Sequence, residues 1–328
     1  MCSNGKSFRT NRDKDIINFH KKEAYIGANV NGSRADKFIE LKLDRDNPKI
    51  IRINKNQIES YKELETGISA VVFSPDDLKL VKDGPQERRT FLDLGISQVK
   101  PVYGYNLNRY NKILFQRNKL LKSNKLKSEL INLLEVFDVQ IAKIGTSIIQ
   151  ERNTYLNEFN HICKNTHHSL TSNKENIEIK YSTNVPILNN KLEMEHVYLK
   201  LLKDNFNRDI ECGTTEFGPH RDDMLMYIDN MDVRVFGSQG QQRTVVLALK
   251  LSEVEIIKKE KNVYPIVLLD DVFSELDEDR RNYLTRSFSK MQTFITVTDA
   301  VDIKSLDGFD KSIYYIENGI VEKRRYIW

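Results

Sequence analysis

An apolar run that ends in two aspartates constrains this chain more than any other feature. Residues 263–277 read V-Y-P-I-V-L-L-D-D-V-F-S-E-L-D. The unbroken apolar residues before the acids predict a strand buried on both faces, as in a parallel sheet. Asp270 and Asp271 would lie where this strand leaves the core, where one carboxylate can hold Mg²⁺ through its water shell and the other can orient or deprotonate water. The alternative is an acid pair that only caps the next turn, and the S-E-L-D that follows favours the functional interpretation.

A second segment predicts the start of a helix that can bind an anion. Residues 236–244 read F-G-S-Q-G-Q-Q-R-T, and Ser238 and Gln241 have the spacing of a capping box, so Ser238 should cap a helix that begins near Gln241. Free backbone N–H groups and the helix dipole attract anions at such a terminus. The candidate phosphate-binding residues are therefore Ser238, Gln239, Gly240 and Gln241. The predicted strand and acid pair downstream strengthen this interpretation.

The glycine-rich loop that should accompany these segments, G-x-x-x-x-G-K-[ST], is complete nowhere in the 328 residues. Gly5, Lys6 and Ser7 resemble its last part, but no strand is predicted before them and the charged residues 8–15 do not predict the apolar helix that should follow. A sheet without this central strand has unpaired backbone groups and exposed apolar faces. We therefore expect the chain as printed to aggregate instead of giving a monodisperse, cooperatively melting sample.

Composition places the chain among globular proteins of mixed charge. Of its residues 39% are apolar and 30% charged, with 51 Lys and Arg against 47 Asp and Glu, so the surface permits nucleic acid as a partner without requiring it. No apolar run approaches the roughly 18 residues of a membrane span, and residues 1–14 are too polar for a signal peptide. The sequence predicts a cytoplasmic protein with free thiols at Cys2, Cys163 and Cys212.

Turn signals and apolar periodicity divide the chain into strand-rich ends and a helical middle, which extends from residue 88 to about residue 206. The first three expected strands form a β-meander, whereas the later strands alternate with helices and predict a largely parallel sheet. The active edge of such a sheet lies at the carboxyl ends of its strands. The expected strands are residues 25–30, 38–43, 50–53, 68–73, 224–229, 265–269 and 293–297, and the later helices are residues 241–258 and 279–287.

The helical middle carries a run of cations. Its members are Arg109, Lys112, Arg117, Lys119, Lys122, Lys125 and Lys127. A solvated helix face is the preferred interpretation, because charge runs on helices usually lie at the surface, and a stripe that contacts phosphates is the alternative.

Together these segments resemble the RecF family, bacterial recombination-mediator ATPases of the SMC and Rad50-like branch of the ATP-binding cassette class. The resemblance covers nearly the whole chain, because several specific motifs follow one another in the order of the family. The chain departs from the family pattern in two ways: Asp83 stands where glycine is usual, and the strand and G-x-N-G-x-G-K-T loop that precede residues 5–10 in the family are absent. Asp271 stands where many cassette ATPases have glutamate, but aspartate is usual in RecF-like proteins. The motifs are S-F-R-T at 7–10, P-D-D-L-K-L-V at 75–81, G-P-Q-E-R-R-T-F-L-D at 84–93, T-E-F-G-P-H-R-D-D at 215–223, S-Q-G-Q at 238–241 and D-D-V-F-S-E-L-D at 270–277.

The resemblance implies an α/β fold: an ATPase head of the cassette and SMC type, with a mixed and parallel sheet, flanking helices and an inserted helical lobe. Residues 1–90 would form the first part of the head without its Walker A strand and loop. Residues 91–206 would form the helical lobe. Residues 207–328 would complete the head with the signature, Walker B and D-loop motifs.

The resemblance also implies the roles of single residues toward ATP and Mg²⁺. Asp270 would position Mg²⁺ through water and Asp271 the attacking water. Ser238 and Gly240, with Gln239 and Gln241 in the same motif, would meet the γ-phosphate held by a second subunit. Asp277 would contribute to the dimer contact, and Arg9 would face the nucleotide. His220 and Arg221 fit three interpretations: the composite nucleotide site, DNA contact, or buried structural polar residues.

The implied function is ATP-controlled binding of single-stranded and gapped duplex DNA in gap repair and replication restart. The implied partners are RecR, RecO and indirectly RecA, within an ATP-dependent homodimer associated with the nucleoid. Two alternatives remain open. In the first, the chain is a non-catalytic subunit that lends its signature motif to an intact subunit. In the second, it is an SMC-like ATPase that acts outside recombination.

Overall fold

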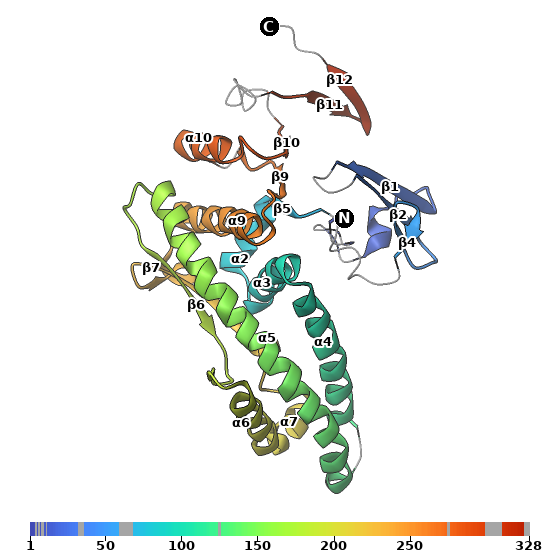
Figure 1. Cartoon of the computed structure of the whole chain (residues 1–328), viewed down its shortest axis with the longest axis vertical. Coiled ribbons are helices and arrows are strands. Elements are labelled where there is room, and N and C mark those ends of the chain that lie inside the picture. The colour runs from blue at the N-terminus through green and yellow to red at the C-terminus, as the bar shows by residue number, and fades with distance from the viewer. Residues whose placement is uncertain are drawn as a thin grey trace.

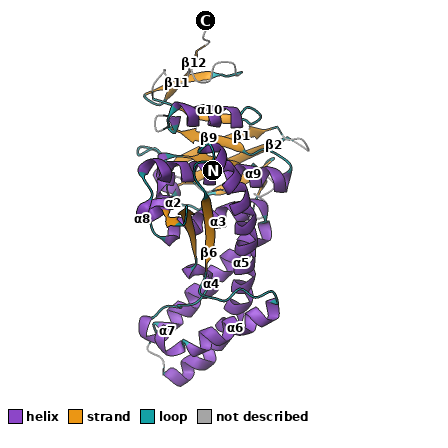
Figure 2. Ribbon diagram, turned by 90° about the vertical axis from the view of Figure 1, so that its left-hand side faces the viewer, coloured by secondary structure: helices purple, strands orange, loops and turns teal. Residues whose placement is uncertain are grey.

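The computed structural model describes residues 1–3, 5, 7, 10, 12–31, 36–58, 68–123, 126–273, 276–298 and 310–324. Figure 1 shows an elongated molecule in which the strands of the head gather at one end and a lobe of long helices extends to the other. Viewed from the side, helices α6 (Lys191–Asp204) and α7 (Phe206–Cys212) lie near the far end of this lobe (Figure 2). No helix within the described ranges is both long and apolar enough to cross a membrane.

The amino-terminal part folds into an antiparallel sheet in the order β1-β2-β3-β4, which confirms the predicted meander. Alternation along β2 points Ile39, Leu41 and Leu43 into the core and leaves the residues between them more exposed. A single turn of 3-10 helix, η1 (Asp13–Ile16), precedes the sheet. The four strands are β1 (Glu23–Val30), β2 (Lys37–Asp44), β3 (Ile50–Ile53) and β4 (Asn56–Gln57).

The central sheet consists of three parallel strands in the order β10-β9-β5, so the predicted parallel sheet is confirmed for this part. One face, with Val71, Leu269 and Ile295, packs on the helices α9 and α10. On the other face Leu268 pairs with Phe294, whose side chain is 54% exposed. The strands are β5 (Ala70–Phe73), β9 (Ile266–Asp270) and β10 (Thr293–Thr296), and the helices are α9 (Gln239–Lys261) and α10 (Glu278–Ser287).

The middle of the chain is mostly helical, as predicted, but it also contains a strand that was not predicted. Strand β6 (Ile177–Ser182) pairs antiparallel with β7 (Asp223–Ile228), which in turn pairs with β8 (Met231–Asp232). The expectation that residues 224–229 belong to the parallel sheet was therefore wrong. The helices of this part are α3 (Pro85–Val99), α4 (Pro101–Leu121), α5 (Lys127–Leu170), α6 (Lys191–Asp204) and α7 (Phe206–Cys212).

Short elements join these layers. A 3-10 turn and a short helix follow β5, and another 3-10 turn and short helix flank the β7–β8 hairpin. A two-stranded antiparallel hairpin lies near the carboxyl end, beyond the strands that were predicted. These elements are η2 (Pro75–Leu78), α2 (Lys79–Lys82), η3 (Pro219–Arg221), α8 (Val233–Phe236), β11 (Ile313–Glu317) and β12 (Ile320–Arg324).

The cation run of the helical middle is not a solvated face throughout. Arg117, expected on a solvated face, is fully buried because it bridges three elements: Nε donates to Asp138 at 2.6 Å, and Nη1 donates to Asp209 at 2.7 Å and to Thr215 at 2.8 Å. The two carboxylates compensate the buried guanidinium charge, and the cluster ties α4 to α5 and α7.

We predict that Arg117→Ala lowers the free energy of unfolding by about 3–5 kcal/mol, because it leaves Asp138 and Asp209 buried without a counter-charge. Chemical denaturation measures this loss. Arg109→Ala is the matched control on the same helix, since Arg109 is exposed, and it should change stability by less than about 0.5 kcal/mol. Equal effects of the two substitutions would contradict a bridging role for Arg117.

Candidate nucleotide site

The carboxyl ends of the three parallel strands meet at one edge of the central sheet. The register places Phe73 beside Leu269 and Thr296 beside Asp270. Asp270 is the last residue of β9 and is exposed, as the sequence predicted. Because successive side chains alternate between faces, Asp270 and Thr296 lie on the same face as Phe294, away from the face that α9 covers.

Thr296 fixes both members of the acid pair. Its hydroxyl donates to Asp270 Oδ1 at 2.7 Å. The backbone N–H of Asp271 donates to the Thr296 carbonyl and hydroxyl oxygens, each at 3.2 Å. Asp271 adopts φ 51°, a left-handed conformation that aspartate tolerates better than most residues. Thr296 was not among the predicted site residues, although its place at the end of a predicted strand was a usable signal.

The chain after the acid pair returns to the core and then begins α10. Phe273 and Leu276 are buried, and Ser274 and Glu275 lie outside the described residues. Asp277 caps α10, because its side chain accepts from the backbone N–H of Arg280 at 2.9 Å and also bonds the Arg280 guanidinium. Its predicted place in a dimer contact stays a prediction.

The predicted capping box at the start of α9 is confirmed. The Ser238 hydroxyl accepts from the Gln241 N–H at 3.2 Å, and the Gln241 side-chain oxygen accepts from the Ser238 N–H at 2.9 Å. The helix begins at Gln239, two residues before the predicted start. Ser238, Gln239 and Gly240 are exposed, so another molecule can reach this terminus.

Glu175 holds the capping glutamine in place and was not predicted. The Gln241 amide nitrogen donates to Glu175 Oε1 at 3.0 Å. This bond directs the amide oxygen of Gln241 toward Ser238, which is the orientation that the capping box needs. Glu175 lies between α5 and β6, so the candidate signature helix is fastened at its first turn to the end of the long helix α5.

A buried charge cluster fixes the segment after β5 against α9. Lys250 Nζ lies 3.1 Å from Glu253 Oε2 and 3.9 Å from Asp77 Oδ1. Burial raises the pKa of both carboxyl groups, and Lys250 partly offsets this effect. Burial by itself lowers the pKa of Lys250, but the two acids outweigh it and the pKa is raised. The cluster therefore holds together as paired charges.

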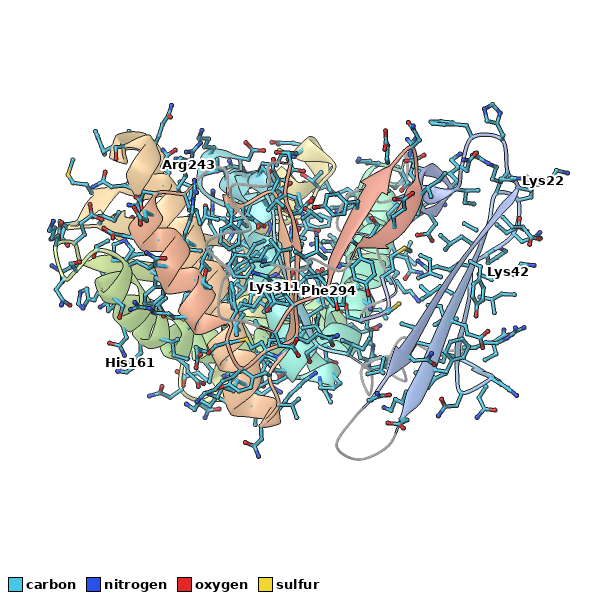
Figure 3. The ribbon with its side chains drawn as sticks, turned by 90° about the horizontal axis from the view of Figure 1, so that it is seen from above. Lys22, Lys42, His161, Arg243, Phe294 and Lys311 are labelled. Carbon is cyan, nitrogen blue, oxygen red and sulfur yellow. The ribbon has the colours of Figure 1, made fainter. Side chains whose placement is uncertain are left out.

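The two halves of the candidate site have different surroundings. The start of α9 contacts Glu175, whereas Asp270 contacts Thr296 at the sheet edge. One turn into α9, Arg243 lines a cavity of about 40 Å³ with Asp77 and Val272. Seen from above, Arg243 lies on the opposite side of the molecule from Lys22 and Lys42 of the β1–β2 sheet (Figure 3). Arg9, the other predicted nucleotide contact, lies outside the described residues.

His220 and Arg221 have structural partners. The Nδ1 atom of His220 lies 2.8 Å from the Tyr110 hydroxyl, and its Nε2 atom lies 2.9 Å from the Thr215 carbonyl oxygen. Arg221 Nε donates to the same carbonyl at 3.2 Å. Burial lowers the pKa of His220 to about 4. These contacts support a structural role for both residues, although His220 is half-buried and Arg221 is exposed.

Named proteins resemble this chain over nearly its whole length. No family model matches the chain. A "DNA replication and repair protein RecF" from Alkaliphilus oremlandii is 44% identical over 325 residues, which is 98% of this chain and 88% of the relative. The protein of the same name from Clostridium novyi is 42% identical over 322 residues, with 98% and 88% covered.

Several solved structures share the fold of this chain. A structure titled as RecF with ATP in the RecFOR pathway has a TM-score of 0.88 at 34% identity and covers 98% of this chain and 87% of that one. A second, titled as RecF with ATPrS, has the same TM-score and identity, with 98% and 86% covered. An SMC head bound to the C-winged helix domain of ScpA shares the fold at a TM-score of 0.50 and 13% identity, covering 96% of this chain and 79% of that one.

The fold is that of an ATPase head of the SMC type. The level of identity to the named relatives goes further: the chain belongs to the RecF family of DNA replication and repair proteins.

Since the folded pKa of His220 lies below its ordinary value of 6.5, the unfolded chain binds this proton more readily, and stability falls as the pH drops from 6.5 toward 4. We predict that His220 contributes about 2 kcal/mol to the stability lost between pH 7 and pH 5. Denaturation of the chain and of His220→Gln at both pH values measures the difference. An equal loss in both proteins would contradict the buried neutral histidine.

Proposed function

We propose that the chain is the ATP-responsive head of a DNA-binding protein that acts in recombinational gap repair and replication restart. The observation that carries the proposal is the arrangement of Asp270, Asp271 and Thr296 at the sheet edge of a RecF-family chain. ATP binding is supported by the solved RecF–ATPrS and RecF–ATP structures that this chain resembles. The replication and repair role is supported by the names of the relatives.

The residues at the sheet edge fit Mg²⁺ and a nucleotide. Carboxylate and hydroxyl oxygens are ligands that Mg²⁺ prefers. Among the described residues no cluster of three or more His, Cys, Asp or Glu could hold a metal alone, which suits an ion that takes most ligands from phosphates and water. When bound, Mg²⁺ supplies charge neutralisation at the phosphates. Asp270 would hold it through water, while Thr296 keeps that carboxylate oriented.

Asp271 would orient and deprotonate the attacking water. Its backbone N–H is fixed by Thr296, so its position relative to Asp270 is set before nucleotide arrives. The start of α9, with Ser238, Gln239, Gly240 and Gln241, would close over the γ-phosphate bound by a second copy, because exposed N–H groups at a helix terminus favour an anion. Asp277 would lie at the dimer contact, and Arg9 would face the nucleotide.

In this proposal ATP binding favours a closed dimer on DNA and hydrolysis reopens it. The DNA ligands are single-stranded and gapped duplex DNA, and contacts to phosphates make binding dependent on salt. RecR and RecO are the proposed partners, supported by structure titles that place RecF in the RecFOR pathway. Through them the protein would assist RecA loading near the nucleoid.

We predict that Asp271→Asn lowers DNA-dependent ATP turnover at least about 100-fold without weakening ATP binding, because an amide cannot accept the proton of the water. The assay uses the chain extended at its amino terminus with a strand and a complete G-x-x-x-x-G-K-[ST] loop. Steady-state turnover and nucleotide binding are measured side by side. Asp279→Asn, an exposed acid in the first turn of α10, is the control and should leave both unchanged. If ATP turnover were unchanged in Asp271→Asn, the proposed hydrolytic role of Asp271 would be contradicted.

A further inference from the structure

Helix α4 carries a row of exposed cations on one face. Its 21 residues include neither aspartate nor glutamate. Arg109, Lys112 and Lys119 are exposed, and Lys122 follows at the end of the helix. Spacings of three and seven residues place them on the same side. We call these four residues the α4 cationic face; at about 1.5 Å rise per residue it extends for about 20 Å.

The charges of the α4 cationic face are not neutralised by neighbours. None of the four cations forms an ion pair within the described ranges, in contrast to buried Arg117 on the same helix, which pairs with Asp138 and Asp209. Figure 1 shows α4 along one edge of the helical lobe with α5 on its inner side. The arrangement therefore presents positive charge along an open edge, which attracts a polyanion.

An aromatic side chain lies among these cations. Phe115 is 71% exposed and stands three residues after Lys112 and four before Lys119, so all three share one side of the helix. Exposure of a phenyl ring to water is unfavourable, and a flat ring between cations is the combination that binds single-stranded nucleic acids, in which cations contact phosphates and rings stack on bases. A folded acidic protein would match the charge but would not need an isolated ring.

We propose that the α4 cationic face is a nucleic-acid-binding surface on which the four cations contact backbone phosphates and Phe115 stacks on an unpaired base. The inference rests on the proposed function and adds to it the place of contact and a preference for single-stranded segments. The surface differs from the nucleotide site, since the residues of that site lie on β9, β10 and α9.

The test measures binding of the full chain to a labelled single-stranded oligonucleotide over a range of salt concentrations. In the variant Arg109→Gln, Lys112→Gln, Lys119→Gln and Lys122→Gln, the slope of log K against log [salt] should become shallower by about 3, because each lost phosphate contact to a single strand removes about 0.7. The control replaces the same number of exposed lysines elsewhere, Lys174, Lys191, Lys200 and Lys290, by glutamine, and should keep the slope.

The outcomes separate the inference from the proposed function. The α4 surface is overturned if the slope stays unchanged in the α4 variant, or if it becomes shallower by the same amount in the control. The proposed DNA-binding function stands in both cases. If the unaltered chain binds no DNA even at low salt, the proposed DNA-binding function fails and the surface with it. All eight positions are exposed, so neither variant should change the folding of the chain, and thermal melts compare each variant with the unaltered chain.

The stacking contact is tested in the same assay with single-stranded and duplex oligonucleotides. Phe115→Ala should weaken single-strand binding at least about fivefold and leave duplex binding unchanged, since stacked base pairs offer no free face to the ring. Phe115→Tyr should retain affinity, and Phe294→Ala, which removes another exposed ring, should have no effect. Equal loss on both DNA forms, or no loss, overturns the stacking contact.

Discussion

Helix α9 is buried on two opposite faces, and the positions of both halves of the candidate site depend on this burial. Val245, Ala248 and Ile256 belong to the core shared with the helical lobe, whereas Leu251 and Val254 belong to the core under the parallel sheet. A helix packed on both sides has little freedom to rotate or slide, because either movement would open a cavity. Its first turn therefore carries the signature residues at a fixed place relative to the sheet edge.

The same constraint explains why charged groups are buried along α9. Lys250 and Glu253 lie where the helix meets the segment after β5, a position that apolar side chains could also fill. A buried ion pair adds little net stability, but removing one of its two partners is costly. The pair therefore favours one packing arrangement of the chain among several that bury a similar apolar area. Asp77 completes this arrangement and holds the turn that follows β5 beside the end of β9.

Local sequence patterns predicted most of the helices and strands and two segments of the candidate site. The run before Asp270 and the S-x-x-Q spacing at Ser238 are short-range signals, and both elements were found where the pattern placed them. Contacts between distant segments were not predictable. Thr296 lies 26 residues along the chain from its partner Asp270, and Arg117 lies 92 residues from its partner Asp209. Strand β6 was missed although its alternating I-E-I-K-Y-S pattern was readable, because the surrounding helical periodicity was extended across it.

A single helix joins the lobe surface to the candidate signature. Helix α5 is 44 residues long, so at about 1.5 Å per residue it extends for about 66 Å, and α4 packs along its first part. Glu175 lies in the connection after the far end of α5, with its Oε2 atom 3.6 Å from Nε2 of His167 on the same helix, and bonds Gln241 at the start of α9. A rigid helix transmits a shift of one end to the other, whereas a chain of flexible loops would absorb it. A ligand on α4 can thus influence the signature by moving α5 relative to α9, and the Glu175–Gln241 bond is a contact that such a movement would change.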